Sequence, residues 1–151
     1  MANTPQQFQV DFTRLLRRAG VRAQAVVKAS SLKLLESIDQ KSPVGNPSLW
    51  ADPSSAPAGY TGGQFRANWN YSTGSPDLTV TDSVDPQGGE SMRKAVGTSY
   101  RLGDKIYISN SLPYAYRLEY EGWSKEQAPN GMVRVSVVEF RDFVRQAAAQ
   151  L

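Results

Sequence analysis

Apolar residues recur with a helical period near the N-terminus. They return every three or four positions with arginine and lysine between most of them, and the series is Phe8, Phe12, Leu15, Leu16, Ala19, Val26, Val27, Leu34, Leu35 and Ile38. This spacing places the apolar residues on one face of a helix. It predicts a long amphipathic helix, in which Gly20 costs up to about 1 kcal/mol relative to alanine and marks a bend or a close packing contact.

Local signals define both ends of this helix. Thr4 precedes Pro5, so Thr4 is a suitable N-cap residue and Pro5 occupies the first helical position. Gln7 stands three residues after Thr4 and can complete a capping box. The Ser42-Pro43 step disfavours helical backbone, because the residue before a proline avoids that conformation. We therefore expect the helix to end near Gln40.

Proline and glycine dominate positions 43–63, which contain eight of these residues. That density prevents regular structure over most of the stretch. Loops of about 20 residues are uncommon in compact domains and are usually functional or disordered. This loop contains Leu49, Trp50 and Tyr60, which are costly to leave in water. We therefore predict a functional loop in which Trp50 and Tyr60 face a partner.

Runs rich in aromatic and β-branched residues follow the loop. Phe65–Tyr71, Leu78–Val84 and Lys105–Ser109 have the composition of strands. We expect these three strands to pair in one antiparallel sheet. Glu90–Tyr100 is predicted as a short helix, although Gly97 weakens its helical propensity.

The last third of the chain predicts two more helices. Tyr116 and Tyr120 stand at helical spacing in Pro113–Tyr120, which predicts a helix of one to two turns. A final helix is expected from Pro129 to the C-terminus, because apolar residues keep a helical period there. The β-branched run Val133–Val138 favours a strand instead, but the helical spacing continues beyond it.

These elements predict one α+β domain over residues 1–151. In it a small antiparallel sheet packs against a long N-terminal amphipathic helix and a C-terminal helix, and the Pro/Gly-rich loop at 43–63 is an insertion. The composition, 40% hydrophobic and 21% charged, is that of a globular protein. No apolar run reaches the roughly 18 to 20 residues of a membrane-spanning helix, and the first residues lack the apolar core of a signal peptide. We expect no membrane contact and a cytoplasmic start.

The chain has no cysteine and no histidine. These absences remove disulfides, thiolate nucleophiles, cysteine-ligated metals and the usual general acid or base near neutral pH. We therefore expect no cofactor, no metal site and no enzymatic activity. Glu119 and Glu121 do not define the cleft of a glycosidase, and we interpret them as surface or interface ion pairs. A cell-wall-degrading enzyme is consequently the least favoured function class.

Positive charge is concentrated in the predicted N-terminal helix. The net charge is +3, and Pro5–Lys41 contains seven basic and three acidic residues. Four arginines suit a DNA-facing surface, because phosphate contacts need only positive charge; they are Arg14, Arg17, Arg18 and Arg22. A solvated polar face is the simpler interpretation. No stacking aromatic residues interleave with these arginines, which disfavours specific nucleic-acid recognition.

The chain has more large aromatic residues than a core of this size requires, with three tryptophans and seven tyrosines. Core packing accounts for Trp69 and Tyr107. Trp123 stands among glycine and charged residues, as Trp50 and Tyr60 do among proline and glycine. Trp and Tyr are enriched at protein interfaces, so we expect these three residues to face a partner.

The segment Ile106–Val133, with its Ser-Leu-Pro-Tyr-Ala-Tyr and Ala-Pro-Asn-Gly-Met motifs, resembles the signature of a phage tail-component family. That family is found beside the head-tail connector genes of lambdoid siphophages. Ser42-Pro43-Val44 and Thr61–Trp69 are similar to the family's Ser-Pro-Val, Thr-Gly, Leu-Arg and Trp pattern. The family runs this pattern almost continuously, so the intervening loop is an insertion here. Glu121 and Glu126 depart slightly from the family's tighter spacing.

The resemblance implies a structural virion protein of the phage neck. Proteins of this family complete the tail and join it to the head, and the chain would form a six-fold ring on the tail axis. Its expected partners are itself, the head-tail connector, tail-terminator or tail-tube proteins, and genome DNA passing through the lumen. It would assemble in the host cytoplasm. A tail-terminator ring is the nearest alternative, and a free basic nucleic-acid-binding protein is a more distant one.

The resemblance also suggests which residues meet a neighbouring subunit. Tyr114 and Tyr116 would anchor the contact between subunits. Pro129 would open the last helix, with Met132 beside it at the interface, and Asn130-Gly131 would set the approach of that helix. A ring follows when such a heterologous contact closes on itself.

Overall fold

The computed structural model of the chain describes residues 5–151. The predicted N-cap residue Thr4 and the side chains of Phe8, Phe12 and Leu16 lie outside the described part. Within that part, no helix is both long and apolar enough to cross a membrane. The predicted α+β class is confirmed, with a small antiparallel sheet, a long N-terminal helix and a C-terminal helix.

The predicted N-terminal helix is confirmed as α1 (Pro5–Lys41). Its last turn closes when the Ser42 amide donates to the Asp39 carbonyl at 3.0 Å, immediately before Pro43. A Cβ added at Gly20 would meet no atom within 4 Å, so the predicted close packing contact at that glycine is wrong.

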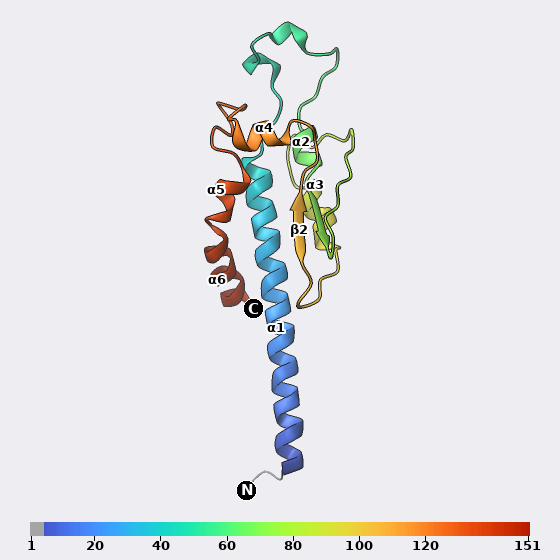
Figure 1. The fold of residues 1–151 in the computed structure, drawn as a ribbon, viewed down its shortest axis with the longest axis vertical. Helices are drawn as coiled ribbons and strands as arrows, with labels where there is room; N and C mark the ends of the chain where they lie inside the picture. Colours follow the sequence, from blue (N-terminus) through green and yellow to red (C-terminus); the bar gives the residue numbers. More distant parts are fainter. Residues whose placement is uncertain (1–4) are drawn as a thin grey trace.

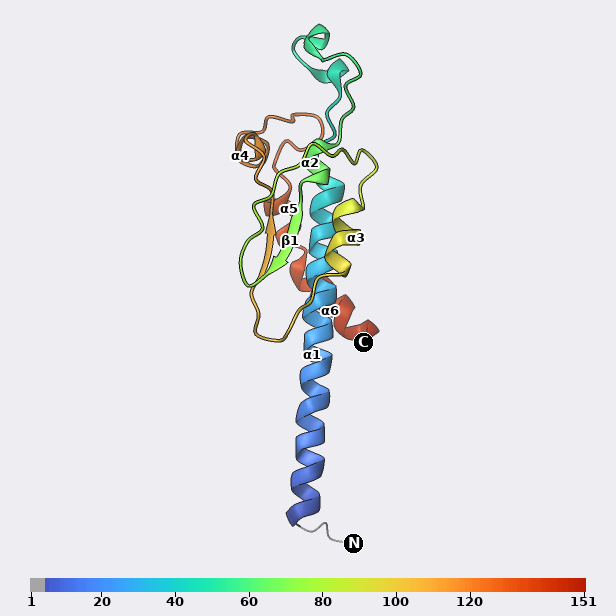
Figure 2. The same cartoon turned by 90° about the vertical axis from the view of Figure 1, so that its right-hand side faces the viewer.

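The molecule is built around α1, which runs through its whole body (Figures 1 and 2). Strands β1 (Asn70–Thr73) and β2 (Ile106–Ser109) and helix α3 (Glu90–Val96) lie on one side of α1. Helices α5 (Val133–Val137) and α6 (Phe140–Gln150) lie on the other, and α6 makes the most extensive contact with α1. The first turns of α1 project beyond this body at one end.

The sheet of the described residues has two strands, not the three predicted. β1 and β2 pair antiparallel, with Asn70 opposite Ser109 and Thr73 opposite Ile106. The prediction for Lys105–Ser109 is therefore confirmed apart from its first residue. The prediction for Phe65–Tyr71 is correct only for its last two residues, because the preceding ones form the helical turn α2 (Gln64–Ala67).

The predicted strand Leu78–Val84 is wrong, because the segment has no regular secondary structure and joins no β ladder. Side-chain amides bind its backbone in place of a neighbouring strand. The Asn68 amide accepts from the Thr81 amide at 2.8 Å and donates to the Thr81 carbonyl at 2.9 Å. Asn70 Nδ2 donates to the Thr79 carbonyl at 2.8 Å. These amides satisfy the backbone groups that a third strand would have used.

The predicted helix Glu90–Tyr100 is confirmed but ends earlier, at Val96 before Gly97. Lys28 on α1 stabilises that end, because its ammonium donates to the carbonyls of Ala95 and Thr98 at 2.8 and 2.6 Å. A cation at a helix C-terminus is favourable both as a hydrogen-bond donor and against the helix dipole. This contact fixes α3 against α1.

The predicted short helix is confirmed as α4 (Ala115–Tyr120). The single final helix predicted from Pro129 is wrong in two respects. It begins at Val133, and it is divided into α5 and α6 by a turn at residues 138–139. The alternative strand over Val133–Val138 is also wrong.

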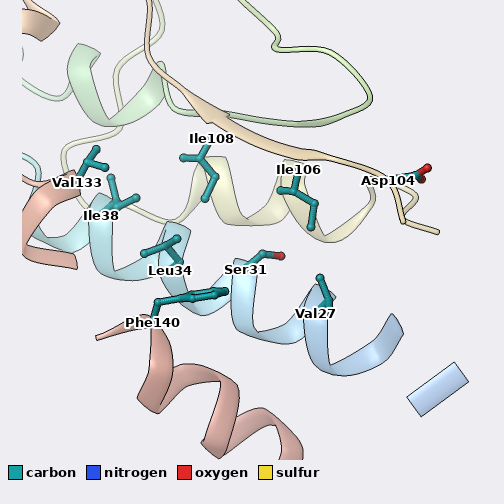
Figure 3. Close-up of a pocket in the computed structure, with 9 residues that line it drawn as sticks. All are labelled: Val27, Ser31, Leu34, Ile38, Asp104, Ile106, Ile108, Val133 and Phe140. Carbon is teal, nitrogen blue, oxygen red and sulfur yellow. The ribbon is translucent and has the colours of Figure 1, made fainter. Parts of the chain in front are cut away.

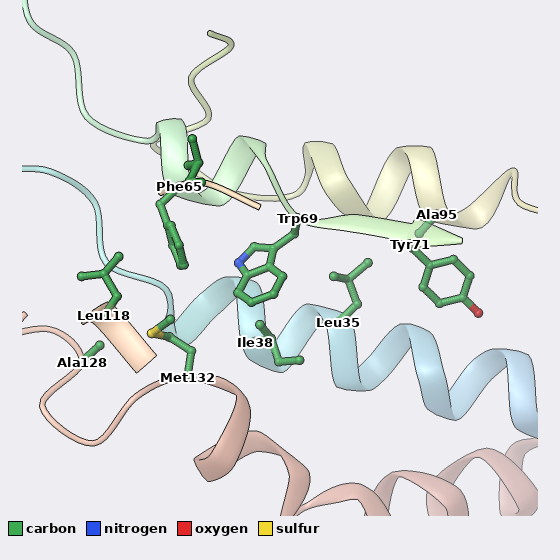
Figure 4. Packing of buried hydrophobic residues seen from close by; sticks show 10 residues of the cluster. Leu35, Ile38, Phe65, Trp69, Tyr71, Ala95, Leu118, Ala128 and Met132 are labelled. Atoms are coloured by element: carbon green, nitrogen blue, oxygen red, sulfur yellow. The ribbon is translucent and has the colours of Figure 1, made fainter. Parts of the chain in front are cut away.

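The hydrophobic core lies where α1, β1 and the C-terminal segments meet, as Figure 4 shows. The Trp69 ring is buried there, as predicted, and its indole N–H donates to Ser42 Oγ at 2.8 Å. Tyr107 is half-buried and lies outside this cluster, contrary to the prediction. The fully buried side chains at the centre are Leu35, Ile38 and Met132.

Candidate interaction surfaces

Three large aromatic side chains, two on α4 and one in the turn after it, are mostly in solvent: Tyr116, Tyr120 and Trp123, with exposed fractions of 64%, 57% and 55%. We refer to these three residues as the α4 aromatic surface. The rings of Tyr116 and Tyr120 lie one helical turn apart, with centroids separated by 4.9 Å. Exposed Trp and Tyr side chains are typical of residues that contribute most to protein interfaces.

Two arginines border the α4 aromatic surface. The Arg117 guanidinium lies 4.6 Å from the centroid of the Trp123 ring, and that of Arg134 lies 5.2 Å from the Tyr120 ring. Such cation-π contacts hold the rings in place. The surface is therefore partly preorganised, which reduces the entropy lost when a partner binds.

Glu119, also on α4, points towards the start of α5 and is only 7% exposed. Its carboxylate accepts hydrogen bonds from the backbone amides of Met132, Val133 and Arg134 at 2.8, 3.0 and 3.0 Å. These are the unpaired amides at the start of α5, so Glu119 caps that helix. The predicted ion pair is present, because Arg134 Nε lies 3.4 Å from the Glu119 carboxylate, but the predicted surface position is wrong, since Glu119 is buried. The prediction agrees with the structure for Glu121, which is exposed and lies 3.9 Å from Arg117.

Gly131 allows the Glu119 cap to form. It has a φ of +82°, and an added Cβ would lie 2.6 Å from the Glu119 carbonyl oxygen. Only glycine fits both the conformation and the space. The role predicted for Asn130-Gly131 in setting the approach of the last helix agrees with this geometry, whereas Pro129 precedes the helix by several residues.

The predicted interface residues near α4 do not form one surface. Tyr116 and Trp123 belong to the α4 aromatic surface, and Pro129 is exposed in the turn before α5. Tyr114 is half-buried against Phe65, with 5.9 Å between ring centroids, and burial raises the pKa of its phenol. Met132 is 1% exposed, so the prediction that it faces a partner is wrong.

The predicted loop 43–63 has a defined structure and projects from the end of the body opposite the N-terminus (Figures 1 and 2). It contains two short 3-10 helices, η1 (Pro47–Leu49) and η2 (Pro53–Ser55). Asn46 and Asp52 cap them by accepting from the amides of Ser48 and Ser54 at 3.1 and 3.0 Å. These caps give the loop a local structure although neither 3-10 helix buries a residue.

Aromatic and amide contacts close the base of this loop. The rings of Trp50 and Tyr60 meet edge to face, with centroids 5.1 Å apart. The Tyr60 ring covers Gly45, where any added Cβ would clash with it. The Gln127 amide joins the base of the loop to the segment after α4, because it exchanges hydrogen bonds of 2.9 and 2.8 Å with the backbone of Val44. Tyr60 remains 40% exposed, whereas Trp50 is half-buried.

The projecting part of α1 holds the predicted basic residues. Arg14, Arg17 and Arg18 are exposed on it. Arg22 is exposed where α1 enters the body, and its guanidinium donates to the Ala148 carbonyl at 3.1 Å. Because Ala148 lies in the last turn of α6, Arg22 stabilises the C-terminus of that helix. Arg22 therefore has a structural role as well as a position beside the other arginines.

An apolar groove runs along α1 between β2 and the C-terminal helices (Figure 3). Its volume is about 420 Å³. The side chains that point into it come from three parts of the fold and are Val27, Ser31, Leu34, Ile38, Asp104, Ile106, Ile108, Val133 and Phe140. The sequence contains no local signal for this groove, because its walls are distant in the chain.

The buried carboxylate of Asp39 lies at the C-terminal end of α1. One of its oxygens accepts from the Gly89 amide at 3.0 Å, and the other has no hydrogen-bond partner among the described residues. Burial raises the pKa of Asp39, while the Gly89 amide and the nearby Arg66 oppose that shift. Within residues 5–151, no three acidic side chains gather where they could hold a metal ion.

The three stretches on which the predicted family resemblance rests meet in the structure. Trp69 and Ser42 are joined by the indole hydrogen bond, and Asn110 Nδ2 donates to the Phe65 carbonyl at 2.9 Å. Tyr114 packs on the same Phe65 ring. Comparison with protein-family models, with curated proteins and with solved structures finds no match for this chain.

Proposed function

We propose that this chain is a non-enzymatic structural protein of a tailed-bacteriophage virion. In this proposal it forms a ring at the head-tail junction that completes the tail and joins it to the head. The observation that carries the proposal is the α4 aromatic surface. Tyr116, Tyr120 and Trp123 are exposed within Ile106–Val133, the segment that resembles the tail-component family.

The shape of the chain supports this role. A ring subunit at a junction must contact its own copies and one neighbour on each side. The chain offers a structured loop at one end, a projecting helix at the other, and the α4 aromatic surface near the base of the loop. The proposed neighbours are the head-tail connector and a tail-terminator or tail-tube protein. The virion is the proposed location, reached after assembly in the host cytoplasm.

Electron microscopy of a lysate tests the proposal, using a phage with an early stop codon in this gene. Filled heads beside separate tails of normal length are the expected result, because the joint would be missing. Tails of uncontrolled length would favour the alternative, a tail-terminator ring. Complete and infectious particles would contradict both roles.

We expect the α4 aromatic surface to be required for assembly. Replacing Trp123 with alanine should lower the titre by about tenfold or more when the variant gene complements the stop-codon phage, because truncating an interface hot spot costs about 2 kcal/mol or more per contact. The fold should persist, because the side chain is mostly in solvent. Lys125→Ala, an exposed change in the same turn region, is the matched control. A normal titre for Trp123→Ala would exclude this side chain from the assembly interface.

The exposed arginines favour a second candidate, a free nucleic-acid-binding protein. Both candidates predict contact between DNA phosphates and Arg14, Arg17 and Arg18. Changing these three residues to glutamine should reduce DNA retention in purified virions if the arginines line the ring lumen. When the isolated chain binds duplex DNA, the logarithm of its binding constant falls linearly with the logarithm of the salt concentration. The slope of this line should become shallower by about 0.9 for each phosphate contact removed. Unchanged retention and unchanged salt dependence would show that the arginines do not contact DNA.

A further inference from the structure

The projecting part of α1 has two apolar residues, Leu15 and Ala19, that its own chain leaves uncovered. Residues 5–21 precede Arg22, whose guanidinium contacts α6, and span about 25 Å at 1.5 Å per residue. Leu15 on this part is 62% exposed, and Ala19, one turn further along, is exposed as well. An apolar helix face in water is costly unless another surface covers it.

The apolar groove has the length to meet such a helix along one side. It follows α1 from Val27 to Ile38, about 16 Å or three helical turns. On α1, Val27 and Leu34 are partly exposed, whereas Ser31 and Ile38 are 6% and 1% exposed. The other walls add apolar side chains that are at least partly exposed, from Ile106, Ile108, Val133 and Phe140. In the sequence, the apolar positions 8, 12, 15 and 19 repeat at intervals of four, three and four residues, and a helix with this spacing carries an apolar stripe that can pack against such a surface.

We propose that the projecting part of α1 from one copy of the chain packs into the apolar groove of a second copy. This inference rests on the proposed ring, because it names the contact between adjacent subunits. The two surfaces differ, so the contact is heterologous and each copy can both give and receive a helix. Such contacts produce a ring when their rotation closes.

The charges of the two surfaces are complementary. Asp104 lines one end of the groove, and its carboxylate makes no ion pair within residues 5–151. Arg18 is exposed on the projecting helix, three residues and almost one turn from Leu15. A docked helix would bring this guanidinium group towards the acidic end of the groove. Opposite charges at the edge of an apolar contact favour the correct register.

The groove cannot be filled by the helix of its own chain. Leu15 and Val27 stand on the same continuous helix, about 18 Å apart along its axis. The projecting part would have to break away from α1 to reach the groove. A second copy is therefore the occupant that this chain itself provides.

Disulfide trapping tests the contact directly, because the natural chain has no cysteine. We would mix full-length Leu15→Cys with full-length Ile106→Cys, and separately with Phe140→Cys, under oxidising conditions. A disulfide needs Cα atoms within about 7 Å, so covalent dimers between the two variants report a helix in the groove. Thr13→Cys provides the matched control, since Thr13 is exposed on almost the opposite face of α1. The expected yield with Leu15→Cys is about tenfold above that control for at least one groove position.

Equal yields from Leu15→Cys and Thr13→Cys would overturn the inference. So would yields at the groove no higher than at Lys94→Cys, an exposed position on α3. A chain that stays monomeric at every concentration would overturn it as well.

A charge substitution gives a second readout. In sedimentation equilibrium, Leu15→Glu should raise the dissociation constant of the oligomer by about tenfold or more, because burying one leucine is worth at least that factor. Thr13→Glu should change it by less than about threefold. Both variants should keep the melting temperature of the monomer, since both side chains are exposed. An unchanged dissociation constant for Leu15→Glu would contradict the docking.

Failure of this contact and failure of the proposed function are distinguishable. The stop-codon lysate could contain separate heads and tails while the oligomer forms no disulfides through Leu15→Cys. That pair of results would support the junction role and overturn the docking. Disulfides through Leu15→Cys together with complete infectious particles would support the docking and overturn the junction role.

Discussion

Glu119→Ala should lower the free energy of unfolding by about 3 kcal/mol, measured from urea denaturation. Three backbone amides at the start of α5 lose their acceptor, and the site is too buried for water to replace the carboxylate fully. A buried donor left unsatisfied costs about 1 to 3 kcal/mol. The Arg134 guanidinium, 3.4 Å from the same carboxylate, also loses its partner.

Loss of this cap should also disturb the α4 aromatic surface. Arg134 lies over the Tyr120 ring and donates to the Glu119 carbonyl at 2.6 Å, so the cap and the α4 aromatic surface share one residue. We therefore expect Glu119→Ala to reduce complementation of the stop-codon phage even below its unfolding temperature.

Glu121→Gln is the matched control for Glu119→Ala. Glu121 is exposed and lies 3.9 Å from Arg117, and surface pairs of this kind contribute about 0 to 1 kcal/mol. Its urea midpoint should be nearly unchanged. Similar losses for the two variants would mean that the amides of α5 do not depend on Glu119.

Asn68→Asp should be similarly destabilising, by about 3 kcal/mol at pH 7. The side chain is 1% exposed and uses both of its amide groups. Its nitrogen donates to the carbonyls of Gln64 and Thr81 at 2.8 and 2.9 Å. A carboxylate there would face two carbonyl oxygens without a proton to share, and burying an unpaired charge is costly.

The loss should depend on pH in a defined direction. Burial would raise the pKa of the introduced carboxyl in the folded state above its unfolded value of about 3.9. The loss of unfolding free energy is therefore smallest below about pH 3.9, where the carboxyl is protonated in both states, and grows as pH rises. The difference in unfolding free energy between Asn68→Asp and the natural chain should therefore be smaller at pH 4 than at pH 7. A difference that is constant with pH would contradict burial of the charge.

Asn46→Asp is the control for this substitution. Asn46 is exposed, and its side-chain oxygen accepts from Ser48 at 3.1 Å, a bond that aspartate also makes. Its urea midpoint should remain within a few tenths of a molar unit of the natural chain.

The sequence by itself determined the elements whose signals are local. The apolar period of α1 and the Ser42-Pro43 step predicted a helix that ends within one residue of the expected position. The alternating strand at Ile106–Ser109 and the short helix α4 were predicted for the same reason. Periodicity and turn residues act within a few positions, so they need no knowledge of distant contacts.

The candidate interface was only partly predictable. Trp123 is exposed as expected from its glycine and charged neighbours, and Tyr116 is exposed as the family resemblance implied. Tyr120 was visible as a helical neighbour of Tyr116 but not as a surface residue. Met132 was predicted at the interface but is buried, because the sequence does not reveal which side of a short helical segment enters the core.

Only the tertiary structure decided how polar side chains complete the fold. Leu78–Val84 has the composition of a strand, yet Asn68 and Asn70 bind its backbone and it joins no ladder. Glu119 resembles a surface residue in the sequence but caps a helix that starts 14 residues later. The apolar groove joins α1, β2 and α6, whose residues are far apart in the chain. Each of these outcomes depends on a hydrogen bond or a contact between segments that are not adjacent in the sequence. A buried polar group must be hydrogen-bonded, and only the packing of the chain determines which partner lies close enough.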